Sequence, residues 1–219
     1  LSCDSSDDVI DGVAIFDTRS LEKEILQGQS NVIISYFTPS GDPLPSPLRV
    51  DFLSGTTTLT VKLENELNPA CSVNGTVQFT VQQNPVFNFD EEAILCMNKG
   101  SQKLQVRNPK GTYSYRWEYT NAAGVKTLLP DVTSSIDATN AGVYTVTATD
   151  LTGKMCSTSK SVTLTASNPP KITSEDVSVT DDVFNKNNTI TVDTTNLGIG
   201  DYEFSLNDGP YQDSPVFNN

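Results

Sequence analysis

Polar and apolar side chains alternate along many short stretches of this chain, and turn-forming residues separate the stretches. A period of two puts successive side chains on opposite faces of a β-strand, so the pattern predicts strands with one buried face. The predicted strands are 13–16, 31–37, 48–52, 57–64, 76–82, 103–108, 113–120, 126–130, 143–150, 160–166, 177–182 and 188–195. Only the segment 20–26 has apolar positions at helical spacing, which predicts a short helix ended near Gly28.

The predicted strand 113–120 carries the only tryptophan of the chain. Its alternation puts four aromatic side chains on one face: Tyr113, Tyr115, Trp117 and Tyr119. Trp117 is therefore the expected centre of a β-sandwich core, and the Gly142-Val143-Tyr144 sequence has the form of an immunoglobulin tyrosine corner. The alternative interpretation makes Tyr113, Tyr115 and Tyr119 a stacking surface for a sugar.

Proline-containing segments divide the chain. Pro85 interrupts one strand pattern, and Pro169-Pro170 begin a second extended linker. We predict an all-β chain of tandem immunoglobulin-like antiparallel β-sandwich modules with boundaries 1–85, 86–168 and 169–219. The third module is too short to bury a full core, so we expect it to be incomplete and the native chain to continue beyond Asn219.

Charge and composition narrow the function classes. The chain of 219 residues has a formal net charge of −13 and no histidine. This charge repels nucleic acid and anionic membrane surfaces, and no apolar run approaches the ~20 residues of a spanning helix. The absence of histidine removes the commonest general base, and no G-x-S-x-G, P-loop or dinucleotide motif is present. The sequence therefore predicts a protein that is not an enzyme.

The N-terminal segment concentrates carboxylates without compensating basic residues. The acidic positions are Asp4, Asp7, Asp8, Asp11 and Asp17. Closely spaced oxygen ligands on a loop are what calcium requires, so this segment is the candidate calcium site and Ca²⁺ the candidate cofactor. The spacing does not fit an EF-hand, and the alternative is a solvated acidic turn ahead of a strand.

The chain has four cysteines, Cys3, Cys71, Cys96 and Cys156. None belongs to a C-x-x-C pair, which argues against zinc binding and thioredoxin-like chemistry. An even number of cysteines in small β-modules predicts two disulfides outside the cytosol. Four cysteines allow three connectivities. The simplest is sequential, with Cys3–Cys71 closing the first module and Cys96–Cys156 the second.

The middle module resembles the immunoglobulin-like and PKD-like domains of bacterial surface proteins. The chain resembles tandem repeats of flavobacterial gliding-motility-associated adhesins, which are exported by the type IX secretion system. The resemblance lies in the spacing of Cys3 to Asp17, the GDPLPSP turn, the turn of 68–71 and the final LGIGDYEFSLNDGPYQDSPVFNN. The resemblance implies a secreted or outer-surface stalk that acts in adhesion or gliding motility. Its partners would be neighbouring modules, a surface glycan or another surface protein. The alternative function is a carbohydrate-binding module.

Overall fold

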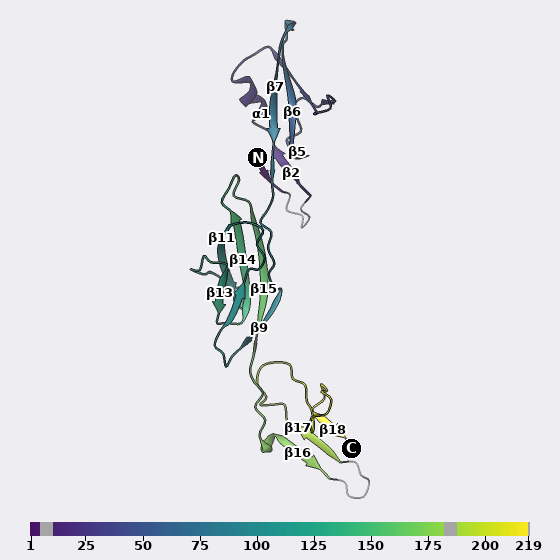
Figure 1. The fold of residues 1–219 in the computed structure, drawn as a ribbon, viewed down its shortest axis with the longest axis vertical. Helices are drawn as coiled ribbons and strands as arrows, with labels where there is room; N and C mark the ends of the chain where they lie inside the picture. The colour runs from purple at the N-terminus through teal and green to yellow at the C-terminus, as the bar shows by residue number, and fades with distance from the viewer. Residues whose placement is uncertain (5–10, 182–187, 219) are drawn as a thin grey trace. The chain divides into compact units, whose positions relative to one another are not determined.

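The computed structural model (Figure 1) describes residues 1–4, 11–181 and 188–218. The chain divides into two compact units. Unit 1 comprises Leu1–Val86, Pro109–Ser114 and Ala148–Thr158, and unit 2 comprises Phe87–Asn108, Tyr115–Thr147 and Ser159–Asn219. The predicted all-β class is confirmed. In the described ranges, strands dominate, and the one α-helix is the six-residue α1 (Leu21–Leu26), close to the predicted 20–26.

The described residues of unit 1 form three small sheets. The largest has the strand order β4-β3-β6-β7, and all its pairings are antiparallel. Its strands are β4 (Pro43–Leu44), β3 (Val32–Phe37), β6 (Thr57–Asn65) and β7 (Asn68–Phe79). A second sheet pairs β2 (Val13–Asp17) with β5 (Asp51–Gly55) in antiparallel register, and a third pairs β1 (Ser2–Cys3) with β8 (Val81–Gln82) in parallel.

The core of unit 1 lies between these sheets and the helix. Tyr36 is fully buried, and Phe79 packs edge to face against Phe16 with ring centroids 4.9 Å apart. The remaining buried members are Ala14, Ile34, Leu48, Leu59 and Val61. Leu21, Ile25 and Leu26 of α1 pack against this cluster, which confirms that the apolar face of the helix covers the core.

A five-stranded sheet of order β12-β11-β14-β15-β9 forms most of the middle of the chain. Its strands are β12 (Lys126–Leu128), β11 (Tyr113–Thr120), β14 (Gly142–Asp150), β15 (Ser157–Ser167) and β9 (Glu92–Cys96). A second antiparallel pair joins β10 (Gln102–Gln105) to β13 (Ser135–Ala138). Trp117 has no exposed surface and its indole N–H donates to the Thr133 carbonyl at 2.8 Å, so its predicted place in the core is confirmed.

The last segment forms a three-stranded antiparallel sheet after a 3₁₀ turn, η1 (Ser174–Asp176). The sheet has the order β16 (Val177–Thr180), β17 (Thr189–Val192) and β18 (Val216–Asn218). Its buried cluster consists of Val192, Leu197 and Phe204. The Tyr202 hydroxyl lies 3.0 Å from the Asn168 carbonyl oxygen and 3.1 Å from that of Leu197.

The strand prediction failed where alternation was absent or short. β1, β4, β9, β13 and β18 were not predicted, and β7 begins at Asn68, well before the predicted 76–82. The first part of β7 is exposed on both faces, so it carries no alternation to detect. β15 pairs in parallel with β9, as β1 does with β8, so these two pairings depart from the antiparallel pattern expected.

Candidate functional site

The feature with the longest reach along the chain is a disulfide between Cys3 and Cys156. The two residues are separated by 153 positions, and their Cα atoms lie 5.6 Å apart. Cys3 belongs to β1, which is held beside β8 by the Asp4 N–H donating to the Gln82 carbonyl at 2.8 Å. Cys156 is buried and directly precedes β15. Both cysteines belong to unit 1.

The side chain of Gln82 makes a second connection beside the disulfide. Its Nε2 donates to the Thr152 carbonyl at 2.9 Å, and its Oε1 accepts from the Lys154 N–H at 2.7 Å. A side-chain amide that uses both its donor and its acceptor on one backbone segment fixes that segment in position and orientation. Sequence reasoning gave Gln82 no role, because the local sequence does not distinguish it from Gln83.

The segment that carries Cys156 is a tight turn. The Asp150 carboxylate accepts from the N–H of Thr152 at 2.9 Å and from its hydroxyl at 2.7 Å. The hydrogen bond from the hydroxyl, followed by that from the N–H, lowers the pKa of the Asp150 carboxyl. Gly153 has a φ of +54°, a region that glycine adopts without strain. A Cβ atom there would lie 2.3 Å from Gln82 Oε1, so glycine also gives Gln82 its space.

The sequential disulfide pairing is wrong. Cys71 lies near the exposed start of β7 and is a free thiol, whereas Cys3 is paired in register with Gln82. Eleven residues of extended chain separate those positions, roughly 35 Å at about 3.3 Å per residue, far beyond the ~7 Å limit between bonded Cα atoms.

Cys96 is excluded by the same argument. It is also a free thiol, and it pairs in register with Ser167 at the end of β15, whereas Cys156 precedes the start of that strand. The sequence could not reveal this because it does not show that β9 pairs in parallel with β15.

The candidate calcium ligands fall into separate environments. Asp7 and Asp8 lie outside the described residues. Asp4 is buried, and its Oδ2 accepts from the Gly12 N–H at 3.1 Å, whereas Oδ1 has no hydrogen-bond partner among the described residues. Asp11 Oδ1 accepts from the Val13 N–H at 2.9 Å, as expected for a turn.

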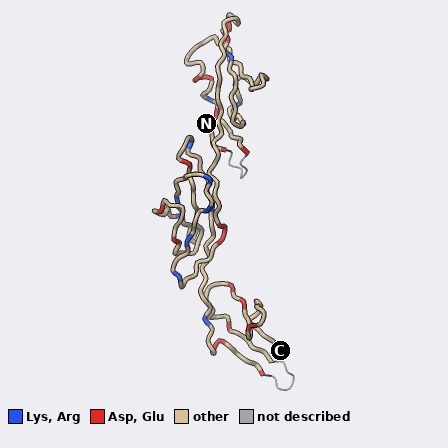
Figure 2. The backbone as a smooth tube through the Cα atoms, in the orientation of Figure 1, with Lys and Arg blue, Asp and Glu red and all other residues tan. Residues whose placement is uncertain are grey.

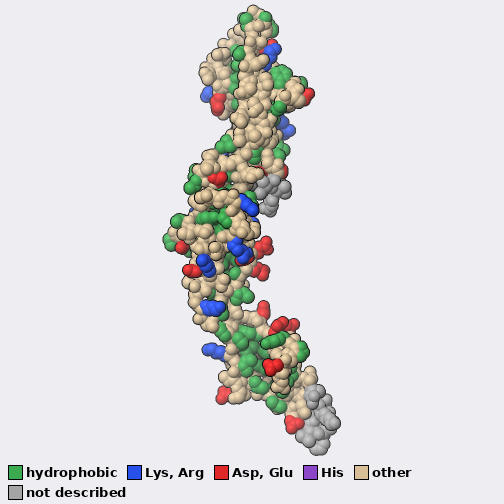
Figure 3. Space-filling model, in the orientation of Figure 1, with side chains coloured by type: hydrophobic (Ala, Val, Ile, Leu, Met, Phe, Trp, Pro, Cys, Tyr) green, Lys and Arg blue, Asp and Glu red, His purple; other side chains and the backbone are tan. Residues whose placement is uncertain are grey.

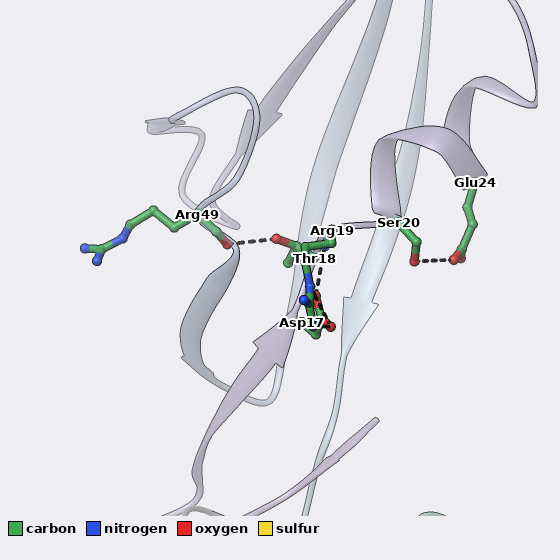
Figure 4. Close-up of polar contacts among 6 residues, drawn as sticks. All are labelled: Asp17, Thr18, Arg19, Ser20, Glu24 and Arg49. Atoms are coloured by element: carbon green, nitrogen blue, oxygen red, sulfur yellow. Dashed lines mark hydrogen bonds and ion pairs between the residues drawn. The ribbon is translucent and has the colours of Figure 1, made fainter.

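Asp17 is engaged by its neighbour Arg19 (Figure 4). The guanidinium donates through Nε to Oδ1 at 2.9 Å and through Nη2 to Oδ2 at 2.5 Å. These side-chain bonds, followed by the Arg19 backbone N–H that donates to Oδ1 at 3.1 Å, lower the pKa of Asp17 to about 2. In residues 1–4, 11–181 and 188–218, no three metal-binding side chains of His, Cys, Asp or Glu come together.

The aromatic face of β11 makes structural contacts. The Tyr113 hydroxyl accepts from the Val86 N–H at 3.3 Å, and the Tyr119 hydroxyl donates to the Ala141 carbonyl at 2.8 Å. Tyr119 also packs on Tyr144, whose hydroxyl donates to the Asn140 carbonyl at 2.9 Å and completes the corner predicted from Gly142-Val143-Tyr144. Tyr115 is half-buried on the same strand.

The N-terminal part of the chain matches a family model. Residues 1–86 match the Flavobacterium inter-domain disulphide bond domain. Cys3 lies in the matched segment, and its bonded partner Cys156 lies outside it. No curated protein matches the chain. No helix in the part of the chain that the structure describes is long and apolar enough to cross a membrane.

The solved structures that the chain matches include tandem immunoglobulin domains. Sidekick-1 immunoglobulin domains 1–5 are 11% identical with a TM-score of 0.31, over 69% of this chain and 34% of that chain, so this chain spans about a third of its length. DIP-gamma IG1+IG2 is 10% identical with a TM-score of 0.27, over 63% and 84%. Human CDH23 EC21-23 is 14% identical with a TM-score of 0.30, over 99% and 90%.

Proposed function

We propose that this chain is a non-enzymatic extracellular segment of a cell-surface adhesin, a stalk that transmits force in surface adhesion or gliding motility. The observation that supports this most is the Cys3–Cys156 disulfide. A disulfide persists outside the cytosol, and a chain with a net charge of −13 and no histidine suits a solvated spacer better than a catalyst. The match of residues 1–86 to a family described by an inter-domain disulfide is consistent with such a role.

The disulfide gives the stalk a covalent route for tension. When the two chain ends are pulled apart, force enters at Leu1, crosses from Cys3 to Cys156, and continues along β15. Residues 4–155 lie in the loop that the disulfide closes, so they are not part of this covalent path. β15 is already extended over 11 residues, and therefore it carries tension along its length with little gain in length.

Single-molecule pulling tests this route. The intact chain is expected to lengthen only through residues after Cys156, whereas reduction of the disulfide adds the enclosed loop. A separation of 153 residues corresponds to roughly 500 Å of added contour length at about 3.5 Å per residue. The double variant Cys3→Ser with Cys156→Ser should give the long extension without reductant, and Cys71→Ser, which changes a free thiol, should behave as the parent chain.

Equal contour lengths with and without reductant would reject the load-bearing role. Surface exposure is tested separately with an antibody against residues 1–86, applied to intact cells that produce the proposed adhesin. Failure to label intact cells, with labelling after lysis, would reject the extracellular assignment.

We also propose that Asp4 is a calcium ligand at the acidic N-terminal segment. Support comes from its buried carboxylate, whose Oδ1 has no protein partner in the described ranges, because a buried charge needs a compensating group. Calcium is expected to raise the thermal midpoint of unit 1, EDTA to lower it, and Asp4→Asn to remove the dependence. A midpoint independent of calcium would remove the ion from the proposal. Asp42→Asn is the comparison variant, because that carboxylate is exposed in unit 1 and lies outside the acidic N-terminal segment.

A further inference from the structure

We infer that the free edge of β7 is a pairing surface for a second copy of this chain. In the strand order β4-β3-β6-β7, β7 is hydrogen-bonded to β6 on one side, and no described strand pairs with its other side. It is 12 residues long, so it presents an extended row of backbone donors and acceptors. This inference does not depend on the proposed stalk function.

The usual protection of an edge strand is missing here. Natural edges are commonly blocked by charged side chains, especially lysine, or by prolines within the strand. Residues 67–89 contain no charged residue, the longest such run in the chain (Figure 2). The only proline of β7 is Pro69, near the start of the strand. Backbone pairing with another strand is therefore unobstructed over most of β7.

The inner face of β7 also extends past the core that it helps to form. The register pairs Val77 with buried Leu59, Gly75 with buried Val61 and Val73 with Leu63. Val77 packs against the core, but Val73, two pairs further along the same face, is 61% exposed. Leu67 in the turn is 85% exposed, and Figure 3 shows hydrophobic side chains at the surface of this end of the hairpin.

Gly75 makes close approach of another backbone easier. It lies in mid-strand, and no atom comes within 4 Å of the position that its Cβ would occupy. Glycine within a strand commonly marks a place where another backbone comes near.

Charge selects a second copy as the occupant. Two chains that each carry −13 repel one another over most of their surfaces, and the repulsion is least where both surfaces are uncharged. An antiparallel pair of β7 strands is self-complementary, as a twofold dimer requires, and it brings two uncharged edges together. β7 itself carries no carboxylate, so it offers a cationic partner no ion pair along the strand.

The test is the oligomeric state of the 219-residue chain, measured by sedimentation over a wide range of protein concentration without reductant, so that the Cys3–Cys156 disulfide stays intact. The parent chain is expected to shift from monomer to dimer as concentration rises. Gly75→Lys puts a charge on the edge where there is open space, and it should weaken dimerisation at least tenfold. Val73→Lys should do the same at an already exposed position.

Two controls separate edge pairing from other causes. Val132→Lys adds the same charge at a position that is 71% exposed outside β7, and it should leave dimerisation within a factor of two. Cys71→Ser should retain the dimer, which shows that strand pairing and not a new disulfide holds it. A parent chain that stays monomeric at the highest concentration overturns the inference. So does a dimer that Gly75→Lys and Val73→Lys leave unchanged while circular dichroism shows both variants to be folded.

Discussion

The side-chain amide of Gln82 donates a 2.9 Å hydrogen bond to the backbone carbonyl of Thr152, across 70 positions of sequence. The same side chain accepts from the Lys154 N–H at 2.7 Å, so one glutamine holds the turn that presents Cys156 to Cys3. Hydrogen bonds within unit 1 thus hold the two disulfide-bonded segments together in addition to the covalent bond.

Replacement of Gln82 by alanine is expected to destabilise unit 1 by about 1–2 kcal/mol, the net value of two intramolecular hydrogen bonds. The loss should be larger in the background of Cys3→Ser with Cys156→Ser, where the hydrogen bonds alone hold the turn. Urea unfolding followed by circular dichroism measures both effects. Gln78→Ala, at an exposed position of β7, is the control and should change stability little. Equal effects of the two alanine variants would contradict this role of Gln82.

Gly142 is expected to tolerate no side chain. Its φ is +146°, and a Cβ would lie 2.6 Å from the Thr120 carbonyl oxygen and 2.7 Å from the Tyr119 ring. Gly142→Ala should therefore cost roughly 3 kcal/mol or more, through backbone strain and a steric clash with the main chain. Fluorescence of Trp117 during urea unfolding reports the change.

Gly124→Ala is the matched control for this variant. Gly124 has a φ of +77° but no atom within 4 Å of its Cβ position, so its alanine variant carries strain without a clash. We expect a cost of about 1 kcal/mol. If both alanine variants cost the same, contact with Thr120 and Tyr119 is not what requires glycine at position 142.

Tyr36 should make unit 1 sensitive to alkaline pH. Burial, followed by the nearby Glu22 carboxylate, raises the pKa of Tyr36 from 10.0 to about 12. The folded state therefore favours the neutral phenol. The resulting stability is fully present below pH 10 and is lost as the pH rises toward 12. The stability difference between the parent chain and Tyr36→Phe, measured by urea unfolding at a series of pH values, should change over this interval.

At neutral pH the same variant should be neutral or stabilising by on the order of 1 kcal/mol, because the buried Tyr36 hydroxyl has no hydrogen-bond partner in the described ranges. Tyr211→Phe is the control, since that ring is 73% exposed. A large loss of stability in Tyr36→Phe at pH 7 would show that the hydroxyl makes a bond that stabilises the fold.

The thiols give a direct check of the disulfide assignment. Denatured, unreduced protein treated with an alkylating reagent should be modified at Cys71 and Cys96 only, as peptide mass spectrometry would show. In the native protein Cys71 should react faster, because it is exposed and Cys96 is partly buried. Modification of Cys3 or Cys156 without reductant would contradict the bond between them.

Local sequence patterns predicted most of the strands and the helix whose own residues alternate or repeat with a clear period. Alternation in 113–120 predicted β11 and the burial of Trp117, and the apolar spacing of 20–26 predicted the short helix α1. The Gly142-Val143-Tyr144 corner was also predicted from the sequence, because the hydrogen bond that forms it joins residues only four positions apart, Tyr144 and Asn140. Elements without alternation, such as the exposed start of β7, gave no such signal.

The sequence by itself determined that this is an acidic β-strand chain with four cysteines, an aromatic core strand and no histidine, since these properties depend on composition and on neighbouring residues. Only the tertiary structure decided that Cys3 bonds to Cys156, that Gln82 supports this bond, and that β7 is an open edge. The physical reason is the pairing of distant strands. The parallel pairing of β1 with β8 sets Cys3 beside Gln82, eleven residues along the chain from Cys71. The parallel pairing of β15 with β9 places Cys96 at the end of β15 that is remote from Cys156. No local sequence pattern encodes either pairing.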